Sequence, residues 1–133
     1  GPWGRPDMAM FIFINKILNG KRVPVFNNGK MKRDFTYIDD IISGTISAID
    51  KNYSKEIFNL GNNKSEKLMK VISLIEKELG KKAIIDFKPM QEGDVKESFA
   101  DIDHSIKKLD YNPKTSIDKG VPALIDWYKR FYA

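Results

Sequence analysis

Apolar residues recur at three- and four-residue spacing in several stretches of the chain, and this spacing predicts amphipathic helices. Asp7 and Ser65 are suitable caps for two of them, and Gly20 and Gly80 are suitable stops. A helix over Asp7–Gly20, one from Asp40 to Ile49, and one over Ser65–Gly80 are therefore expected, with shorter or later ones over Asp103–Leu109 and after Ser116. Each has an apolar face that must be buried.

Short runs rich in β-branched and aromatic residues lie between these helices and predict strands. The runs are Arg22–Phe26, Phe35–Ile38, Glu56–Gly61 and Ala83–Phe87. The turn signal Asn27-Asn28-Gly29 predicts that the first two form a hairpin. Helices that alternate with strands are typical of a parallel sheet, so the pattern predicts an α/β fold.

The composition limits the fold to one domain. The chain has 133 residues, of which 41% are hydrophobic, enough for one core and too few for two. It contains no cysteine, which excludes disulfides, thiolate metal sites and a cysteine nucleophile. We therefore expect a single domain over residues 1–133.

The net charge of +5 raises the question of nucleic acid as a partner. Most lysines lie along the expected helices, as solvated helix faces do. The chain has no zinc-finger spacing and no aromatic RNA-binding motif. The apolar run Met8–Ile14 is far shorter than the roughly 20 residues of a membrane-spanning helix. We expect neither a nucleic-acid nor a membrane partner, and a cytoplasmic location.

The segment Gly29–Asp40 combines cations with a predicted strand and a predicted helix start. Lys30, Lys32 and Arg33 precede the run Phe35–Ile38, after which acidic residues open an apolar helical pattern. Cations at such a position favour a phosphorylated ligand.

Familiar nucleotide and dehydrogenase motifs are missing from the printed sequence. It contains no G-x-x-G-x-x-G or G-x-G-x-x-G after a strand, no phosphate-binding G-x-x-x-x-G-K-[ST], and no Tyr-x-x-x-Lys pair. The lone His104 has no partner at metal-ligand spacing, so we expect a surface residue. The residues alone therefore indicate binding and no cofactor chemistry.

Four segments resemble the C-terminal part of UDP-glucuronate 4-epimerases, members of the extended short-chain dehydrogenase/reductase family. They are Gly1–Ala9 (G-P-W-G-R-P-D-M-A), Arg33–Asp40 (R-D-F-T-Y-I-D-D), Phe58–Gly61 (F-N-L-G) and Met90–Val95 (M-Q-E-G-D-V). The resemblance runs in order through the chain to Trp127-Tyr128. It implies the C-terminal substrate-binding lobe of such an enzyme, with edge elements of its Rossmann sheet and without the NAD-binding domain.

The resemblance also implies a reaction for the full-length parent. In this family NAD takes a hydride from sugar C4, the 4-keto sugar turns over, and the hydride returns to the other face. The tyrosine, lysine and serine or threonine that do the acid and base work have no counterpart in this chain. We therefore expect no catalytic residue here, no NAD bound to this chain, and no activity from it alone.

Three residues correspond to contacts with the diphosphate and the uracil in the resembled family. Arg33 matches an arginine that binds the UDP diphosphate, which suits a planar guanidinium. Its alternative is a surface ion pair with Asp34 or Asp39. Val25 and Phe26 match the segment around the uracil, although Phe26 is also an ordinary core residue.

Three more positions concern the sugar and the ribose. Arg5 matches the partner of the sugar carboxylate, its alternative being a solvated loop arginine. Gln91 stands where many epimerases carry an arginine before Gly-Asp, which weakens a second phosphate contact, and Asp94 matches a ribose contact.

Two other readings of the chain stay open. It fits a non-catalytic UDP-sugar-binding module or truncated remnant, and it fits part of a nucleotide-sugar dehydratase or decarboxylase, since these share much of the lobe. In every case apolar faces meant for the absent lobe would be exposed, so we expect self-association.

Overall fold

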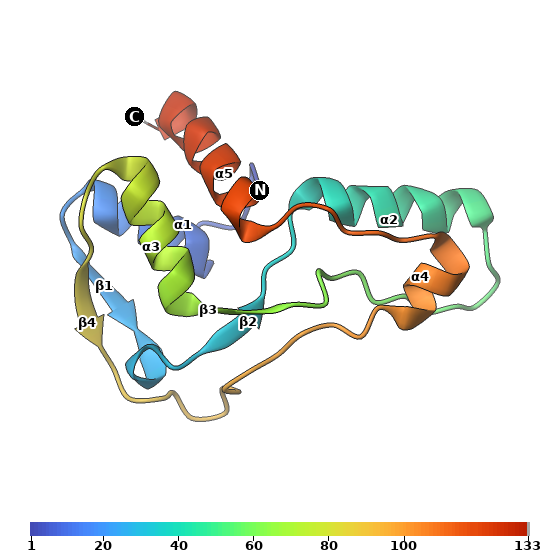
Figure 1. Cartoon of the computed structure of the whole chain (residues 1–133), viewed down its shortest axis with the longest axis horizontal. Coiled ribbons are helices and arrows are strands. Elements are labelled where there is room, and N and C mark those ends of the chain that lie inside the picture. The colour runs from blue at the N-terminus through green and yellow to red at the C-terminus, as the bar shows by residue number, and fades with distance from the viewer. Residues whose placement is uncertain (133) are drawn as a thin grey trace.

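A computed structural model describes residues 1–132 of the chain, and Figure 1 shows an elongated molecule. Its elements follow in the order α1 (Ala9–Leu18), β1 (Arg22–Val25), the 3-10 turn η1 (Phe26–Gly29), β2 (Lys32–Asp34), α2 (Ile38–Lys51), β3 (Ser65–Lys67), α3 (Leu68–Leu79), β4 (Ile84–Phe87), α4 (Asp103–Leu109) and α5 (Ile117–Tyr132). The mixed helices and strands, with one parallel strand pair, confirm the predicted α/β class.

One end of the molecule, which we call the core lobe, consists of α1, β1, α3, β4 and α5 (Figure 1). Its apolar side chains form one cluster, and the most deeply buried include Ile14, Val23, Val71 and Ile75, each with no exposed surface. The three helices contribute because their apolar residues recur along one face, as the sequence pattern predicts.

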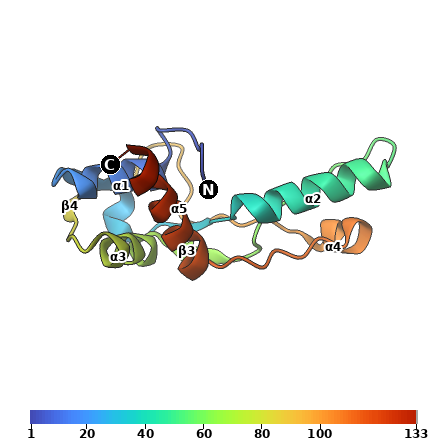
Figure 2. The same ribbon diagram turned by 90° about the horizontal axis from the view of Figure 1, so that it is seen from above.

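The other end, which we call the arm, consists of residues 38–63 and 100–113 and contains α2 and α4. Figures 1 and 2 both show these two helices lying away from the core lobe. The arm has a small core of Ile102, Leu109 and Tyr111, against which Phe58 and Leu60 pack. The arm is thus joined to the core lobe by extended segments more than by helix packing.

The strands pair differently from the predicted hairpin. β1 pairs in parallel with β4, with Val23 opposite Ile85, and β2 pairs antiparallel with β3, with Arg33 opposite Glu66. The hairpin prediction was wrong because Asn27 and Asn28 adopt left-handed backbone angles in η1 and lead the chain out of the first sheet.

Two other boundaries differ from the prediction. Residues Ser65–Lys67 form a strand, so α3 starts at Leu68 instead of being capped by Ser65. The cationic strand is Lys32–Asp34, and the run Phe35–Ile38 instead leads into α2, whose first residue is Ile38. In both places pairing between β2 and β3 decides the structure over local propensity.

The predicted strand Glu56–Gly61 is wrong for the described chain. These residues carry no strand assignment within residues 1–132, and the side chain of Ile57 is 87% exposed. A strand needs a neighbour to bond its backbone, and nothing in the described chain lies beside this segment as a strand.

Residues 1–132 lack two kinds of feature. No described helix has the length and apolar character needed to cross a membrane. The same residues hold no group of three or more histidine, cysteine or acidic side chains placed to bind a metal ion.

Candidate functional site

A cavity of about 500 Å³ opens between the start of α1, the end of β1, and β2. It brings together three of the residues singled out in the sequence, Phe26, Arg33 and Asp94. The rest of its lining is Asp7, Met8, Ala9, Met10, Ile12, Phe13, Pro24, Met31, Asp34, Phe35 and Leu68. The wall is thus mainly apolar, with charged groups at a few positions, which is the usual composition of a small-molecule site.

Arg33 and Asp94 form the central ion pair of this cavity. The Arg33 Nη2 group donates to Asp94 Oδ1 over 2.6 Å, and about a quarter to a third of each side chain is exposed. The two residues are 61 positions apart in the sequence, so neither sequence alternative, a pair with Asp34 or with Asp39, describes this contact. The partner of Arg33 is the residue we predicted as a ribose contact.

The guanidinium of Arg33 keeps donors for a ligand. Besides the bond to Asp94, its Nη1 group donates to the backbone oxygen of Lys32 over 2.8 Å. A guanidinium has five N–H donors, so these two bonds, the ones it makes within residues 1–132, leave three. Asp94 and Lys32 therefore orient the side chain without consuming its capacity to bind an anion.

The positive end of α1 faces the same cavity. The helix begins at Ala9, and its first N–H groups have no intrahelical acceptor. The side chain of Met8 does not cap them. Met8, Ala9 and Met10 all line the cavity. Arg33 and this helix end together make the region attractive to a negative charge.

The three carboxylates that line the cavity are already engaged. Asp7 pairs with Arg5, Asp94 pairs with Arg33, and Asp34 accepts backbone N–H groups. Each negative charge is therefore compensated locally, and a bound anion would meet less repulsion than a simple count of charges suggests.

Val25 and Phe26 are adjacent but point to different places. Val25 has no exposed surface and belongs to the core cluster, while its carbonyl accepts the N–H of Lys88 over 2.9 Å. Phe26 is half-buried and lines the cavity. Only Phe26 of the two has a side chain in the cavity.

Arg5 and Gln91 are not part of the cavity lining, but each is hydrogen-bonded to a lining residue. Arg5 is exposed, and its guanidinium makes two hydrogen bonds to the carboxylate of Asp7. The Nε group donates to Oδ1 over 3.0 Å, and the Nη2 group donates to Oδ2 over 2.5 Å. This pair raises the pKa of Arg5 and lowers the pKa of Asp7. Gln91 is exposed on the turn in which its carbonyl accepts the N–H of Asp94.

Asp34 is a residue of this region that the sequence analysis missed as a site residue. Its carboxylate accepts the N–H groups of Asn62, Asn63 and Ala100, each over 3.1 Å. The sequence offered one signal for Asp34 as a site residue: it directly follows Arg33 at the end of a cationic segment. Its backbone partners are distant in sequence and carry no side-chain pattern.

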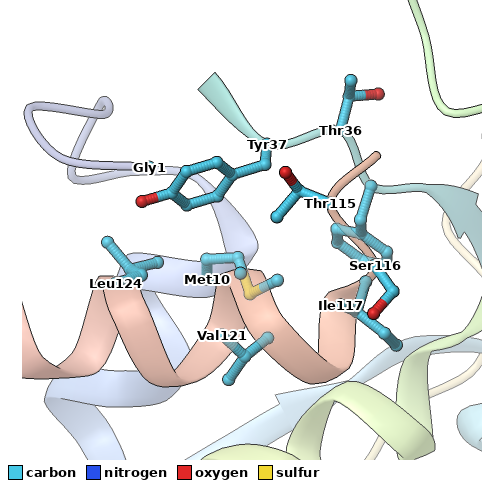
Figure 3. Close-up of a pocket in the computed structure, with 11 residues that line it drawn as sticks. Gly1, Met10, Thr36, Tyr37, Thr115, Ser116, Ile117, Val121 and Leu124 are labelled. Carbon is cyan, nitrogen blue, oxygen red and sulfur yellow. The ribbon is translucent and has the colours of Figure 1, made fainter. Parts of the chain in front are cut away.

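A second, smaller cavity of about 80 Å³ lies where the arm joins the core lobe. Figure 3 shows the ring of Tyr37, just before α2, near Met10 of α1 and Leu124 of α5, with Thr115 beside it. Burial, and secondarily the charge of Asp39, raise the pKa of Tyr37. This cavity is a packing junction, too small for a nucleotide sugar.

His104 lies on the surface, as expected. About half of its side chain is exposed, its Nε2 atom is 2.9 Å from Glu56 Oε2, and its ring stacks on Phe58. These contacts join α4 to the segment after α2, so the role of His104 is structural.

Comparison with known proteins gives relatives over almost the whole chain. Residues 1–61 match the model of the NAD dependent epimerase/dehydratase family. An uncharacterized protein of Methanocaldococcus jannaschii is 52% identical over 128 residues, which are 96% of this chain and 39% of that protein. The UDP-glucuronate 4-epimerase of Thermodesulfobacterium geofontis is 41% identical over 130 residues, 97% of this chain and 40% of that enzyme. The chain thus spans about two fifths of the length of these curated relatives.

Solved structures agree with these relatives. The UDP-glucuronic acid 4-epimerase of Bacillus cereus, in complex with UDP-glucuronic acid and NAD, is 38% identical and superimposes with a TM-score of 0.92. The match covers 99% of this chain and 43% of that one. The α/β fold agrees with the expected C-terminal portion of these enzymes. By sequence and by fold, this chain is similar to the UDP-glucuronate 4-epimerases, and its residues 1–61 match the NAD dependent epimerase/dehydratase family.

Proposed function

We propose that this chain is the substrate-binding part of a nucleotide-sugar epimerase that interconverts UDP-glucuronate and UDP-galacturonate with NAD. The observation that carries the proposal is Arg33, which is held by Asp94 in the cavity of about 500 Å³ and keeps three N–H donors for a ligand. The similarity to a Bacillus cereus enzyme in complex with UDP-glucuronic acid and NAD supports it.

In this proposal the diphosphate lies between Arg33 and the start of α1. A guanidinium binds phosphate oxygens bidentately, and each charged hydrogen bond contributes about 1.5–3 kcal/mol. The free N–H groups and positive end of α1 add to the attraction. The ring of Phe26 then supplies an apolar surface for the uracil, with Val25 behind it in the core.

Sugar selectivity is assigned to Arg5. Its bond to Asp7 places it next to the cavity, because Asp7 is part of the lining. A carboxylate on the sugar would compete with Asp7 for the guanidinium, whereas a neutral sugar would not. Asp94 completes the site as the partner of Arg33 and, as part of the lining, as a contact for the ribose. Gln91 is assigned a weaker role, through the turn in which its carbonyl accepts the N–H of Asp94.

The residues present do not fit a dinucleotide cofactor. The parallel strand β1 runs into η1, with the sequence Phe-Asn-Asn-Gly, where a dinucleotide site would have a glycine-rich turn into a helix. We therefore assign NAD to the full-length enzyme, place no step of the reaction on this chain, and propose that it binds substrate without turning it over. A cytoplasmic location is part of the same proposal.

The test is calorimetric titration of the chain at low salt with UDP-glucuronate, UDP-glucose, UDP and NAD. We expect saturable binding of the UDP compounds, and Arg33→Ala should weaken it by about tenfold or more. Arg22→Ala, which removes an exposed arginine at the start of β1, is the matched control and should leave binding unchanged. Equal losses in both variants, or no binding by the unmodified chain, would overturn the proposal.

Two further arms of this experiment separate the alternatives. Preference for the acidic sugar that is lost in Arg5→Ala supports the glucuronate branch, and equal binding of UDP-glucose favours a general UDP-sugar module or a related dehydratase. UDP-galacturonate formed from UDP-glucuronate and NAD by the chain alone would contradict the assignment of catalysis to other residues.

We also propose that the arm promotes self-association of this chain. The isoleucines of α2 form an exposed stripe, with Ile42, Ile46 and Ile49 about 47%, 51% and 69% exposed. Apolar stripes of this kind are normally covered by protein. Light scattering as a function of concentration tests this, and a clean monomer at high concentration would contradict it.

A further inference from the structure

The carboxylate of Asp34 holds two segments that are far apart in the sequence. Its Oδ1 atom accepts the N–H of Asn62, and its Oδ2 atom accepts the N–H groups of Asn63 and Ala100. The first two amides lead into β3, and the third lies between the turn at residues 91–94 and α4. One half-buried side chain therefore connects β2 both to the loop before β3 and to the segment before α4.

The segment that contains Asp94 is fixed to β2 at two points. The N–H of Lys32 donates to the carbonyl of Lys96 over 2.9 Å, and a parallel bridge joins Lys32 to Glu97. Further along, Asp34 binds the N–H of Ala100. Asp94 lies two residues before Lys96, the acceptor of the first of these bonds. Arg33 lies between Lys32 and Asp34, the two residues of β2 that hold this segment.

We infer that Asp34 is a positioning residue of the substrate site, one that holds the segment of Asp94 against β2 and so keeps the guanidinium of Arg33 aimed at the cavity. This inference rests on the proposed function in so far as the anion at Arg33 is a diphosphate. Asp34 acts through Arg33 and Asp94, and it needs no contact with the ligand.

The backbone around Asp34 is built for close approach. A Cβ atom on Gly61 would lie 2.8 Å from Asp34 Oδ2 and 2.5 Å from the Cβ of Ala100. The glycine lets the loop 61–63 reach the carboxylate with two consecutive amides. Tyr111 holds the same loop from the other side, because its hydroxyl donates to the carbonyl of Gly61 over 2.9 Å.

The chemistry requires a carboxylate at this position. All three partners are N–H donors, and both carboxylate oxygens accept. In Asp34→Asn, one of these oxygens becomes an NH₂ group that faces a donor, so at least one of the three bonds is lost with almost no change in shape. This substitution therefore loosens the attachment without removing the side chain.

The first test needs no ligand. The unfolding free energies of the chain, Asp34→Asn, Asp94→Ala and the double variant form a cycle, measured by urea denaturation. The two side chains make no hydrogen bond to each other among the described residues, and high salt screens the direct repulsion between their charges. A coupling that persists at high salt therefore passes through the shared segment. We expect a clear non-additive effect. Additivity would overturn the inference.

The second test is calorimetric titration with UDP in the background of Arg33→Ala. Asp34→Asn should weaken UDP binding by about tenfold in the unmodified chain and by less than about twofold when Arg33 is already absent. A residue with a merely general structural role would weaken binding equally in both backgrounds, and that result would contradict the inference.

Asp40→Asn is the matched control for both tests. Asp40 is also a carboxylate bound by backbone groups, here the N–H groups of Lys114 and Thr115 at 3.0 and 2.9 Å, but it lies outside the cavity. It should change stability while leaving UDP affinity within about twofold. A loss of UDP affinity as large as that of Asp34→Asn would overturn the inference.

The outcomes separate the inference from the proposed function. No UDP binding by the unmodified chain contradicts the proposed function, and the unfolding cycle still decides the role of Asp34. If Asp34→Asn does not fold, Asp34→Glu, which keeps the charge and shifts the carboxylate by one methylene, takes its place in both cycles with the same expected signs.

Discussion

The core lobe and the arm are stabilised by different kinds of interaction. The core lobe buries a continuous apolar cluster contributed by three helices and two strands. The buried apolar side chains of the arm are Ile102, Leu109 and Tyr111, and isoleucines along α2 are exposed. Figure 2 shows α2 lying apart from the core lobe. The same chain therefore contains a part with a sufficient core and a part without one.

Hydrogen bonds between side chains and backbone supplement the small core of the arm. Tyr111 donates to the carbonyl of Gly61, Ser105 donates to the carbonyl of Asn59 over 2.6 Å, and Asp40 accepts two N–H groups. Such bonds are directional and each contributes only about 0.5–1.5 kcal/mol. The comparison predicts an arm that is well defined but less stable than the core lobe.

The largest difference should come from deleting buried apolar groups in each part. Ile75→Ala in the core lobe removes a side chain with no exposed surface and should cost about 3–4 kcal/mol of unfolding free energy. Leu109→Ala in the arm should cost about 2 kcal/mol, because its smaller core collapses more easily. Urea denaturation followed by circular dichroism measures both. Equal costs would mean that the arm is packed as tightly as the core lobe.

The next effect concerns pH and Tyr111. Burial, with smaller contributions from the charges of Asp40 and Asp34, raises the pKa of Tyr111 from 10 to about 12. The unfolded chain then ionises first, so this contribution to stability is complete below pH 10 and is lost as the pH rises to about 12. Tyr111→Phe should be less stable by about 1 kcal/mol at neutral pH and should lack this part of the pH dependence. An unchanged profile between pH 10 and pH 12 in the variant would contradict the assignment.

A smaller effect on folding is expected on the exposed side of the arm. Ile46→Lys places a charge in the stripe of α2 and should change stability by no more than about 0.5 kcal/mol while reducing self-association. Ser43→Lys adds the same charge at an exposed position off the stripe and serves as the control. Analytical ultracentrifugation compares the three proteins, and the same degree of association in all of them would exclude this face as the interface.

The smallest effect on stability is expected at Asp7. Asp7→Asn releases Arg5 from an exposed pair, so stability should stay unchanged, whereas affinity for UDP-glucuronate should rise by no more than about fivefold. Affinity for UDP-glucose should not change. A parallel rise for both sugars in calorimetric titrations would show that Arg5 does not read the sugar carboxylate.

The sequence predicted those parts of the fold that depend on local periodicity. The helices now seen as α1, α2, α3, α4 and α5 were all expected, since each has an apolar face or a clear stop such as Gly80. Strand β4 was expected from its β-branched residues. These signals are contained within a few turns of chain and need no information about distant partners.

What the sequence did not predict depends on contacts between distant residues. Ser65 has the composition of a helix cap, yet pairing with Asp34 draws it into β3. Arg33 was expected to bind a phosphate or a neighbouring aspartate, and its partner is Asp94, 61 positions away. The three amides bound by Asp34 are backbone groups, which every residue but proline carries, so no residue type marks them.

The close approach at Gly61 has a consequence for how this region can change over evolution. Any side chain at position 61 would collide with the Asp34 carboxylate and with Ala100, so these positions cannot vary independently. A homologue without the aspartate at position 34 loses one of the two contacts that require glycine at position 61. A homologue with a larger residue at position 100 has even less room for a side chain at position 61. We therefore expect positions 34, 61 and 100 to covary as a set, a pattern that an alignment of homologues would display as correlated substitutions.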